Sequence, residues 1–172
     1  GDAVDSAFAL PLGTSAVTVG FGLLITFATA PFDLRGSWII VPIGQALVAV
    51  PLVVRLVLPV LRSIDPRLRE AAATLGSSPL RSWRTVDLPV LGRALAVGAG
   101  FAAAVSLGEF GATSFLARTS APTLPVEIAR LMGRPGDSSS GQAAALSVVL
   151  VVLTGLVVGL VERYRQPGGA AL

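Results

Sequence analysis

Long apolar runs, separated by short polar stretches, dominate this sequence. Four such runs cover residues 7–30, 38–61, 91–116 and 143–161. A helix needs about 20 mostly apolar residues to cross a bilayer core of roughly 30 Å, and each run has about this length. Barrel strands would be shorter and would alternate in polarity, which these runs do not. The pattern therefore predicts an all-α, polytopic membrane helix bundle with about four transmembrane helices.

The polar stretch between the second and third runs, residues 62–90, carries helix boundary signals. Asp65 is a good N-cap and Pro66 suits the first helical position. Gly76 can supply the left-handed residue that ends a helix. These signals predict a short first helix outside the membrane.

Ser78 and Pro79 repeat the start signal for a second short helix. We expect this helix to stop before Pro89, where the third apolar run begins. Two helices clamped between two membrane spans would form a rigid projection that can transmit motion into the bilayer.

The outer loop, residues 117–142, also has readable signals. Residues 124–132 predict a short helix at the membrane surface, closed by Gly133 and Pro135. Residues 136–141 predict a flexible return into the membrane.

Arginine is distributed unevenly between the two sides of the predicted bundle. Eight arginines fall in the central loop and the tail: Arg62, Arg67, Arg69, Arg81, Arg84, Arg93, Arg163 and Arg165. Four fall on the other side: Arg35, Arg118, Arg130 and Arg134. Cytoplasmic loops of membrane proteins are enriched in Arg and Lys, so the central loop and both ends of the chain should face the cytoplasm.

Composition agrees with a membrane protein and excludes several chemistries. Of the 172 residues, 53% are hydrophobic and 13% are charged, and the mean hydropathy is +0.78. The sequence has no Lys, Cys or His. Without Lys there is no candidate for a P-loop. Without Cys and His there are no candidates for thiolate or imidazole metal sites, or for Ser-His and Cys-His nucleophile pairs. The basic residues form no stripe interleaved with stacking aromatics, so we expect no nucleic-acid partner. We also expect no cofactor.

A group of residues in the central loop resembles the EAA loop of ABC-importer permeases of the MetI-like type. The matching residues, in the spacing of that motif, are Glu70, Ala71, Ala72, Gly76, Val86, Leu88 and Pro89. Val86 departs mildly from the usual Ile. The resemblance implies that the loop enters a cleft on a separate ATPase subunit, with Glu70, Ala71, Ala72 and Gly76 as coupling residues.

The residue types support the same role without the resemblance. Ala71 and Ala72 are small enough to let a partner approach the helix backbone. Leu68 and Leu75 lie seven apart on one helix face and can fill an apolar groove, and Glu70 can pair with a basic residue. The alternative is an amphipathic loop that lies on lipid headgroups with Glu70 solvated.

A second resemblance covers residues 106–111 and 123–125, together with Pro51 and Arg55. These are similar to thiamine and ferric-iron permeases of the same superfamily, although sulfate and molybdate permeases share related signatures. The resemblance implies a solute such as thiamine or ferric iron, with sulfate or molybdate-type anions as the alternative. We expect residues 1–172 to form one permease domain, an excerpt of a longer permease.

Two charged residues fall within the predicted spans. Glu109 lies in the outer half of the third run, where an ionisable group is costly unless it faces protein or water. It is therefore a candidate for the translocation path, or alternatively an acceptor of hydrogen bonds in helix packing. Arg55, toward the cytoplasmic end of the second run, either extends to the headgroups or forms an inward ion pair at a gate.

The favoured function is a non-enzymatic importer permease in the bacterial inner membrane. The resemblance implies three partners: an ABC ATPase subunit dimer, a second permease module and an extracytoplasmic solute-binding protein. A gradient-driven transporter would not need the two-helix loop. A membrane enzyme is disfavoured because Glu109 and Arg55 lie near opposite faces of the bilayer.

Overall fold

The computed structural model describes residues 14–28, 33–34 and 37–165. Helices joined by short turns account for most of this part of the chain. In chain order they are α2 (Ala16–Thr26), α3 (Ile40–Arg62), α4 (Pro66–Thr74), α5 (Pro79–Ser82), the π-helical turn η2 (Trp83–Asp87), α6 (Leu88–Gly108), α7 (Thr113–Leu116), α8 (Leu124–Met132) and α9 (Asp137–Arg165). The predicted all-α class is confirmed.

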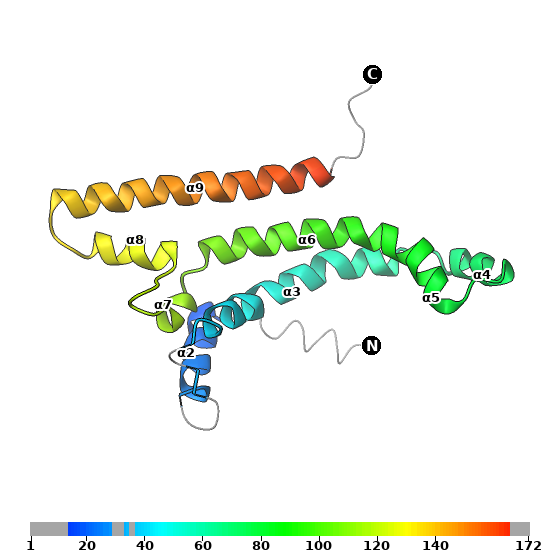
Figure 1. Cartoon of the computed structure of the whole chain (residues 1–172), viewed down its shortest axis with the longest axis horizontal. Helices are drawn as coiled ribbons and strands as arrows, with labels where there is room; N and C mark the ends of the chain where they lie inside the picture. Colours follow the sequence, from blue (N-terminus) through cyan, green and yellow to red (C-terminus); the bar gives the residue numbers. More distant parts are fainter. Residues whose placement is uncertain (1–13, 29–32, 35–36, 166–172) are drawn as a thin grey trace, which may run out of the picture.

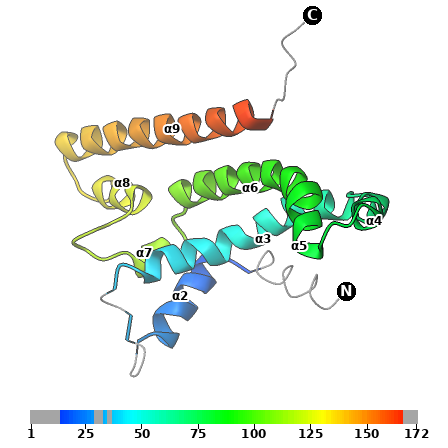
Figure 2. The same ribbon diagram turned by 45° about the vertical axis from the view of Figure 1, so that its right-hand side comes forward.

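Three long helices lie side by side and set the shape of the molecule. Figure 1 shows α3 and α6 running along each other, with α9 on the other side of α6. The view in Figure 2 keeps this order, with α4 and α5 projecting at one end of the long helices and α7 and α8 at the opposite end. Residues 62–90 and residues 117–142 are thus separated by the length of the bundle.

Small residues on α6 allow both neighbouring helices to approach closely. A Cβ at Gly98 would lie 3.1 Å from Val53 of α3, and a Cβ at Gly100 would clash with Val161 of α9. Close backbone approach at small residues is a common way for helices to associate in lipid. One side-chain hydrogen bond adds to this contact, since Gln45 Nε2 donates to the Ser106 carbonyl at 3.0 Å.

In the part of the chain that the structure describes, three helical stretches are long and apolar enough to cross a membrane: Ile40–Arg62, Pro79–Gly108 and Asp137–Arg163. Their side chains are mostly not buried within the chain, and residues such as Val151 and Leu156 of α9 are 71% and 65% exposed. Large apolar side chains exposed at this density suit a lipid environment or contact with further helices. The chain is therefore a multi-pass membrane protein.

The first predicted span, residues 7–30, is only partly described. It contains α2, an apolar helix of 11 residues, which is shorter than the roughly 20 residues that a full span needs. Residues 7–13 and 29–30 lie outside the described residues, as does Arg35. A fourth span therefore stays a prediction.

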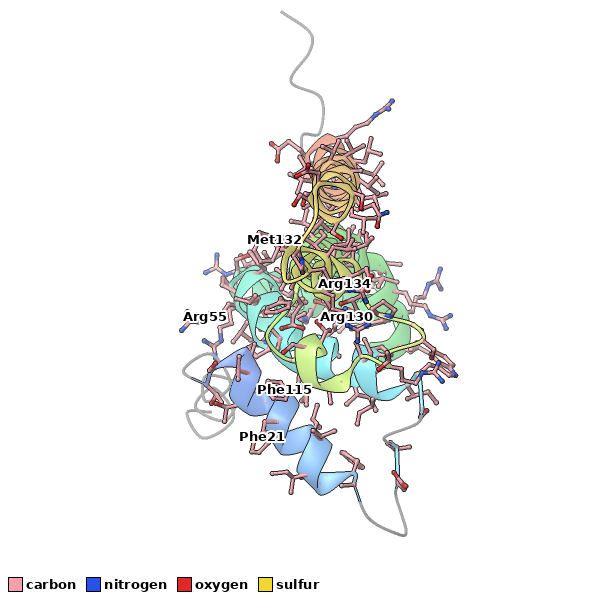
Figure 3. All side chains as sticks on the ribbon, turned by 90° about the vertical axis from the view of Figure 1, so that its left-hand side faces the viewer. Phe21, Arg55, Phe115, Arg130, Met132 and Arg134 are labelled. Atoms are coloured by element: carbon pink, nitrogen blue, oxygen red, sulfur yellow. The ribbon has the colours of Figure 1, made fainter. Side chains whose placement is uncertain are left out.

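A small core lies at the end of the bundle opposite α4. Its buried members, Ile40, Ala112 and Leu116, come from α3 and from the turn and helix after α6. Helix α2 packs over them, and Phe21 and Phe115 meet edge to face with ring centroids 5.8 Å apart, as Figure 3 shows. This core joins α2, α3 and α7.

Two predicted boundaries around α6 were wrong. The second helix of the loop does not stop before Pro89, because the chain stays helical from Pro79 to Gly108. Pro89 has no N–H and its ring would clash with a carbonyl four residues back. The wider π turn accommodates this, since the Leu88 N–H donates to the Trp83 carbonyl, five residues back.

The third predicted run, residues 91–116, also ends early as a helix. α6 stops at Gly108, and Glu109 is extended with φ −71° and ψ 121°. The chain then turns into the separate helix α7, so the apolar run holds two helices instead of one. Apolar composition alone does not reveal this break.

The outer loop is partly as predicted. The short helix at 124–132 is confirmed as α8, although Val126 and Leu131 are buried. The flexible stretch at 136–141 is wrong, because α9 begins at Asp137. An acidic residue in a first helical turn is favoured by the helix dipole, which gives a physical reason for this earlier start.

Candidate functional site

Helix α4 has the capped ends that its sequence predicts. The Arg67 N–H donates to Asp65 Oδ1 at 2.9 Å, and Pro66 occupies the first turn. At the other end Gly76 has φ +77°, a conformation that glycine adopts without steric cost. The Gly76 and Ser77 N–H groups donate to the Ala73 and Ala72 carbonyls at 2.9 and 3.0 Å, which is the Schellman pattern. The length of α4 is therefore determined at both ends.

The second helix starts as predicted. The Arg81 N–H donates to Ser78 Oγ at 3.4 Å, and Pro79 lies in the first turn. Because α5 continues through η2 into α6, this cap is also the start of a 30-residue helix. Any force on α5 therefore acts directly on a membrane-spanning helix.

Four of the predicted coupling residues lie on α4, which has no buried residue, and the other two, Leu75 and Gly76, follow at its C-terminal cap. Leu68 and Leu75 are 52% and 87% exposed, Glu70 and Ala71 are exposed, and Ala72 is half-buried. Figure 1 shows α4 at the outermost end of the molecule. Such exposure of leucines beside a carboxylate and small residues provides an apolar surface with a polar edge.

An ion pair that the sequence analysis missed joins α4 to η2. Arg69 Nε donates to both oxygens of Asp87, at 2.9 and 3.2 Å, and Nη2 donates to Oδ1 at 2.6 Å. Asp87 is 4% exposed. The hydrogen bonds to Asp87 raise the pKa of Arg69, and burial opposes this rise. The available signal was two opposite charges, 18 residues apart, in the loop that was predicted to form two short helices.

Glu109 uses its whole carboxylate to hold the turn after α6. Oε1 accepts from the Ala112 N–H at 2.7 Å and Oε2 accepts from the Thr113 N–H at 2.9 Å. The Thr113 hydroxyl donates to the Glu109 carbonyl at 2.7 Å. Glu109 itself is 7% exposed. This geometry corresponds to the hydrogen-bonding alternative, in which the charge is satisfied within the protein.

Arg55 lies on the outer surface of α3. It is exposed, and Figure 3 shows its side chain directed away from the helix bundle. Arg55 and Glu109 are not brought together, and within the described ranges no group of three acidic, His or Cys side chains could hold a metal ion. Whether Arg55 extends to the headgroups or pairs at a gate stays a prediction.

Comparison with known proteins agrees with this architecture. Residues 5–166 match the family of the binding-protein-dependent transport system inner membrane component. The chain belongs to this family, whose members are MetI-like permeases of ABC transporters.

Three relatives show what the chain is similar to. It is 33% identical to the sulfate transport system permease protein CysT of Salmonella typhimurium, over 96% of this chain and 62% of that protein. It is 33% identical to the putative 2-aminoethylphosphonate transport system permease protein PhnV of the same organism, over 95% of this chain and 60% of that protein. It is 32% identical to the molybdenum transport system permease protein ModB of Escherichia coli, over 90% of this chain and 74% of that protein.

The chain spans about three fifths of the length of the first two relatives. All three are transport permeases by name. None of these names supports the expected closeness to thiamine and ferric-iron permeases, which rested on residues 106–111 and 123–125.

Proposed function

We propose that this protein is the transmembrane subunit of an ATP-driven importer and that α4 docks onto a separate ATPase subunit. The observation that carries the proposal is a short helix, capped at both ends, which exposes Leu68, Leu75 and Glu70 at the tip of the molecule. A helix that buries none of its own side chains is held in shape by its caps and not by a core. Its exposed leucines suit an apolar groove on a partner.

The energy source must come from elsewhere than this chain. The sequence has no Lys, so it has no P-loop, whose Lys reaches the nucleotide phosphates. The proposed complex therefore contains an ATPase dimer, a second permease module and an extracytoplasmic solute-binding protein. The last of these fits a family that is described as binding-protein-dependent.

The proposed orientation places α4 in the cytoplasm. The α4 end of the bundle has the arginines of residues 62–93. Helix α9 runs toward this end and carries Arg163 and Arg165 in its last turn, which lies beside the middle of α6, where Val161 faces Gly100 (Figure 1). The opposite end has Arg118, Arg130 and Arg134 among the described residues. An excess of basic residues near span ends favours the cytoplasmic side.

For the solute, we propose a tetrahedral oxyanion. The three relatives are named for sulfate, 2-aminoethylphosphonate and molybdenum. A carboxylate that lines the outer mouth of the path, as Glu109 would if it faced water, would favour a cationic solute such as thiamine. Both oxygens of Glu109 accept backbone N–H groups, and the residue is 7% exposed, so that argument for thiamine or ferric iron loses its basis.

Docking is tested by co-purification of the cognate ATPase subunit with the complete permease. Glu70→Arg with Gly76→Pro should abolish recovery of the ATPase, because the first change reverses a charge and proline cannot adopt the φ of +77° found at Gly76. Leu75→Ser should weaken recovery. Met132→Ser is the matched control, since Met132 is 73% exposed at the opposite end of the bundle. Undiminished recovery with the Glu70→Arg, Gly76→Pro variant would contradict the proposal.

The solute class is tested by uptake into cells that lack their own transporters and express the complete system. Labelled sulfate, molybdate and 2-aminoethylphosphonate should be taken up or should compete with one another. Thiamine and ferric iron should not. Uptake that persists without the ATPase subunit would instead indicate a gradient-driven transporter.

A further inference from the structure

The contact between Arg69 and Asp87 is stronger than an ordinary surface ion pair. Exposed pairs contribute little because water screens them and ordering the side chains costs entropy. Here the guanidinium makes three hydrogen bonds to one carboxylate, and the side chain of Asp87 is only 6% exposed, against 44% for Arg69. A bidentate contact of Arg with a carboxylate fixes the relative orientation of the two side chains and is stronger than a single hydrogen bond.

The position of the pair gives it a mechanical role. Arg69 is the residue before Glu70, in the middle of α4. Asp87 is the last residue of η2, directly before α6 begins. Since α4 buries no side chain of its own, the ion pair is the specific side-chain link from this exposed helix to the base of a membrane-spanning helix.

The π turn places Asp87 where it can make this link. Residues 83–87 form a wider turn ahead of Pro89, so Asp87 is rotated relative to its place in a regular α-helix. Asp87 is buried beside α4, while its neighbour Leu88 is 39% exposed. The turn that accommodates the proline therefore also directs a carboxylate toward Arg69.

We infer that Arg69 and Asp87 are a positioning pair that transmits the movement of α4 to α6. Without the pair, α4 would keep its chain connection through the turn at residues 75–78 and its packing contacts with α5 and η2, but it would lose its charged link to Asp87. The ATPase would still bind α4. Part of the ATPase movement would then only rotate α4 and would not reach α6. This inference rests on the proposed function, and it names a residue pair distinct from Leu68, Glu70 and Leu75, the residues proposed to contact the ATPase.

The readout is solute transported per ATP hydrolysed, measured with the complete transporter in proteoliposomes. Asp87→Asn keeps the shape of the side chain and removes its charge, and Arg69→Gln removes the charge of its partner. Each should lower the ratio by about threefold or more, an effect of the size seen for residues along a coupling route. Recovery of the ATPase with the permease should stay unchanged. Arg67→Gln is the matched control, because it removes an exposed charge from the same helix.

The double variant separates a pair from two independent residues. If the two act through each other, Arg69→Gln with Asp87→Asn should lower the ratio no further than the worse single change. Additive losses would overturn the inference. So would an unchanged ratio in Asp87→Asn, or an equal loss in Arg67→Gln.

A covalent replacement keeps the inference testable if a single variant assembles poorly. The chain contains no Cys, so Arg69→Cys with Asp87→Cys can be bridged by a short bifunctional thiol reagent. Bridging should restore the transport ratio, and a bridged variant that stays uncoupled would contradict the inference. If the unmodified transporter shows no ATP-driven uptake, the proposed function is wrong. If it does and Asp87→Asn behaves the same, only the inference is wrong.

Discussion

Two glycines of α2 provide a sharp test of how this helix packs. A Cβ at Gly20 would lie 2.5 Å from the Ala112 Cα and 2.6 Å from the Ala112 carbonyl oxygen, both backbone atoms. At Gly22, two residues later in the same helix, a Cβ would meet no atom within 4 Å. The same Gly→Ala change is therefore obstructed at one position and free at the other.

The magnitudes follow from these distances. Non-bonded carbons prefer separations of about 3.5–4.0 Å, so α2 would have to move about 1 Å away from Ala112. Overpacking of this kind costs about 1–3 kcal/mol. Ala is preferred over Gly in a helix by about 0.5–1 kcal/mol. Once the helix gain is subtracted from the overpacking cost, Gly20→Ala should destabilise the protein by about 0.5–2 kcal/mol, whereas Gly22→Ala should be neutral or stabilising.

The assay is thermal unfolding of the complete permease in detergent or nanodiscs, with the two variants measured beside the unmodified protein. For a domain of this size about 1 kcal/mol corresponds to about 2–4 °C in Tm. Tm should fall for Gly20→Ala and should stay or rise for Gly22→Ala. A Gly20→Ala variant at least as stable as Gly22→Ala would refute the packing of α2 on Ala112.

Two further predictions concern the turn after α6 and the orientation in the membrane. Glu109→Gln has one acceptor oxygen for two backbone N–H groups, so it should leave one N–H unsatisfied and destabilise the protein by about 1–3 kcal/mol. An unchanged Tm would contradict this. In a chain without Cys, a membrane-impermeant maleimide added to spheroplasts should label Thr119→Cys and not Arg81→Cys. Both positions are exposed, and the reverse labelling would invert the proposed topology.

The parts that the sequence predicted correctly depend on local interactions. The N-caps at Asp65 and Ser78 and the left-handed Gly76 involve residues within a few positions of each other. The bounds of α8 were also correct, and Gly133, which was predicted to close it, is its C-cap. Such signals act over one helical turn, so their outcome does not depend on the rest of the fold.

The parts that the sequence did not predict depend on residues that meet only after folding. Arg69 and Asp87 are 18 residues apart and are joined because the π turn rotates one toward the other. The end of α6 at Gly108 was hidden inside an apolar run, since hydropathy does not report where a backbone bends. The start of α9 at Asp137 was hidden by residues that usually mark loops.

The sequence by itself determined that this chain is a helical membrane protein with a two-helix loop, because apolar run length and helix caps are local properties of the chain. Only the tertiary structure decided how the charges are used. Glu109 is satisfied by the backbone of the turn that follows it, and Asp87 by an arginine from α4. The physical reason is that a buried charge must find its partner in three dimensions, and sequence spacing does not specify which one it finds.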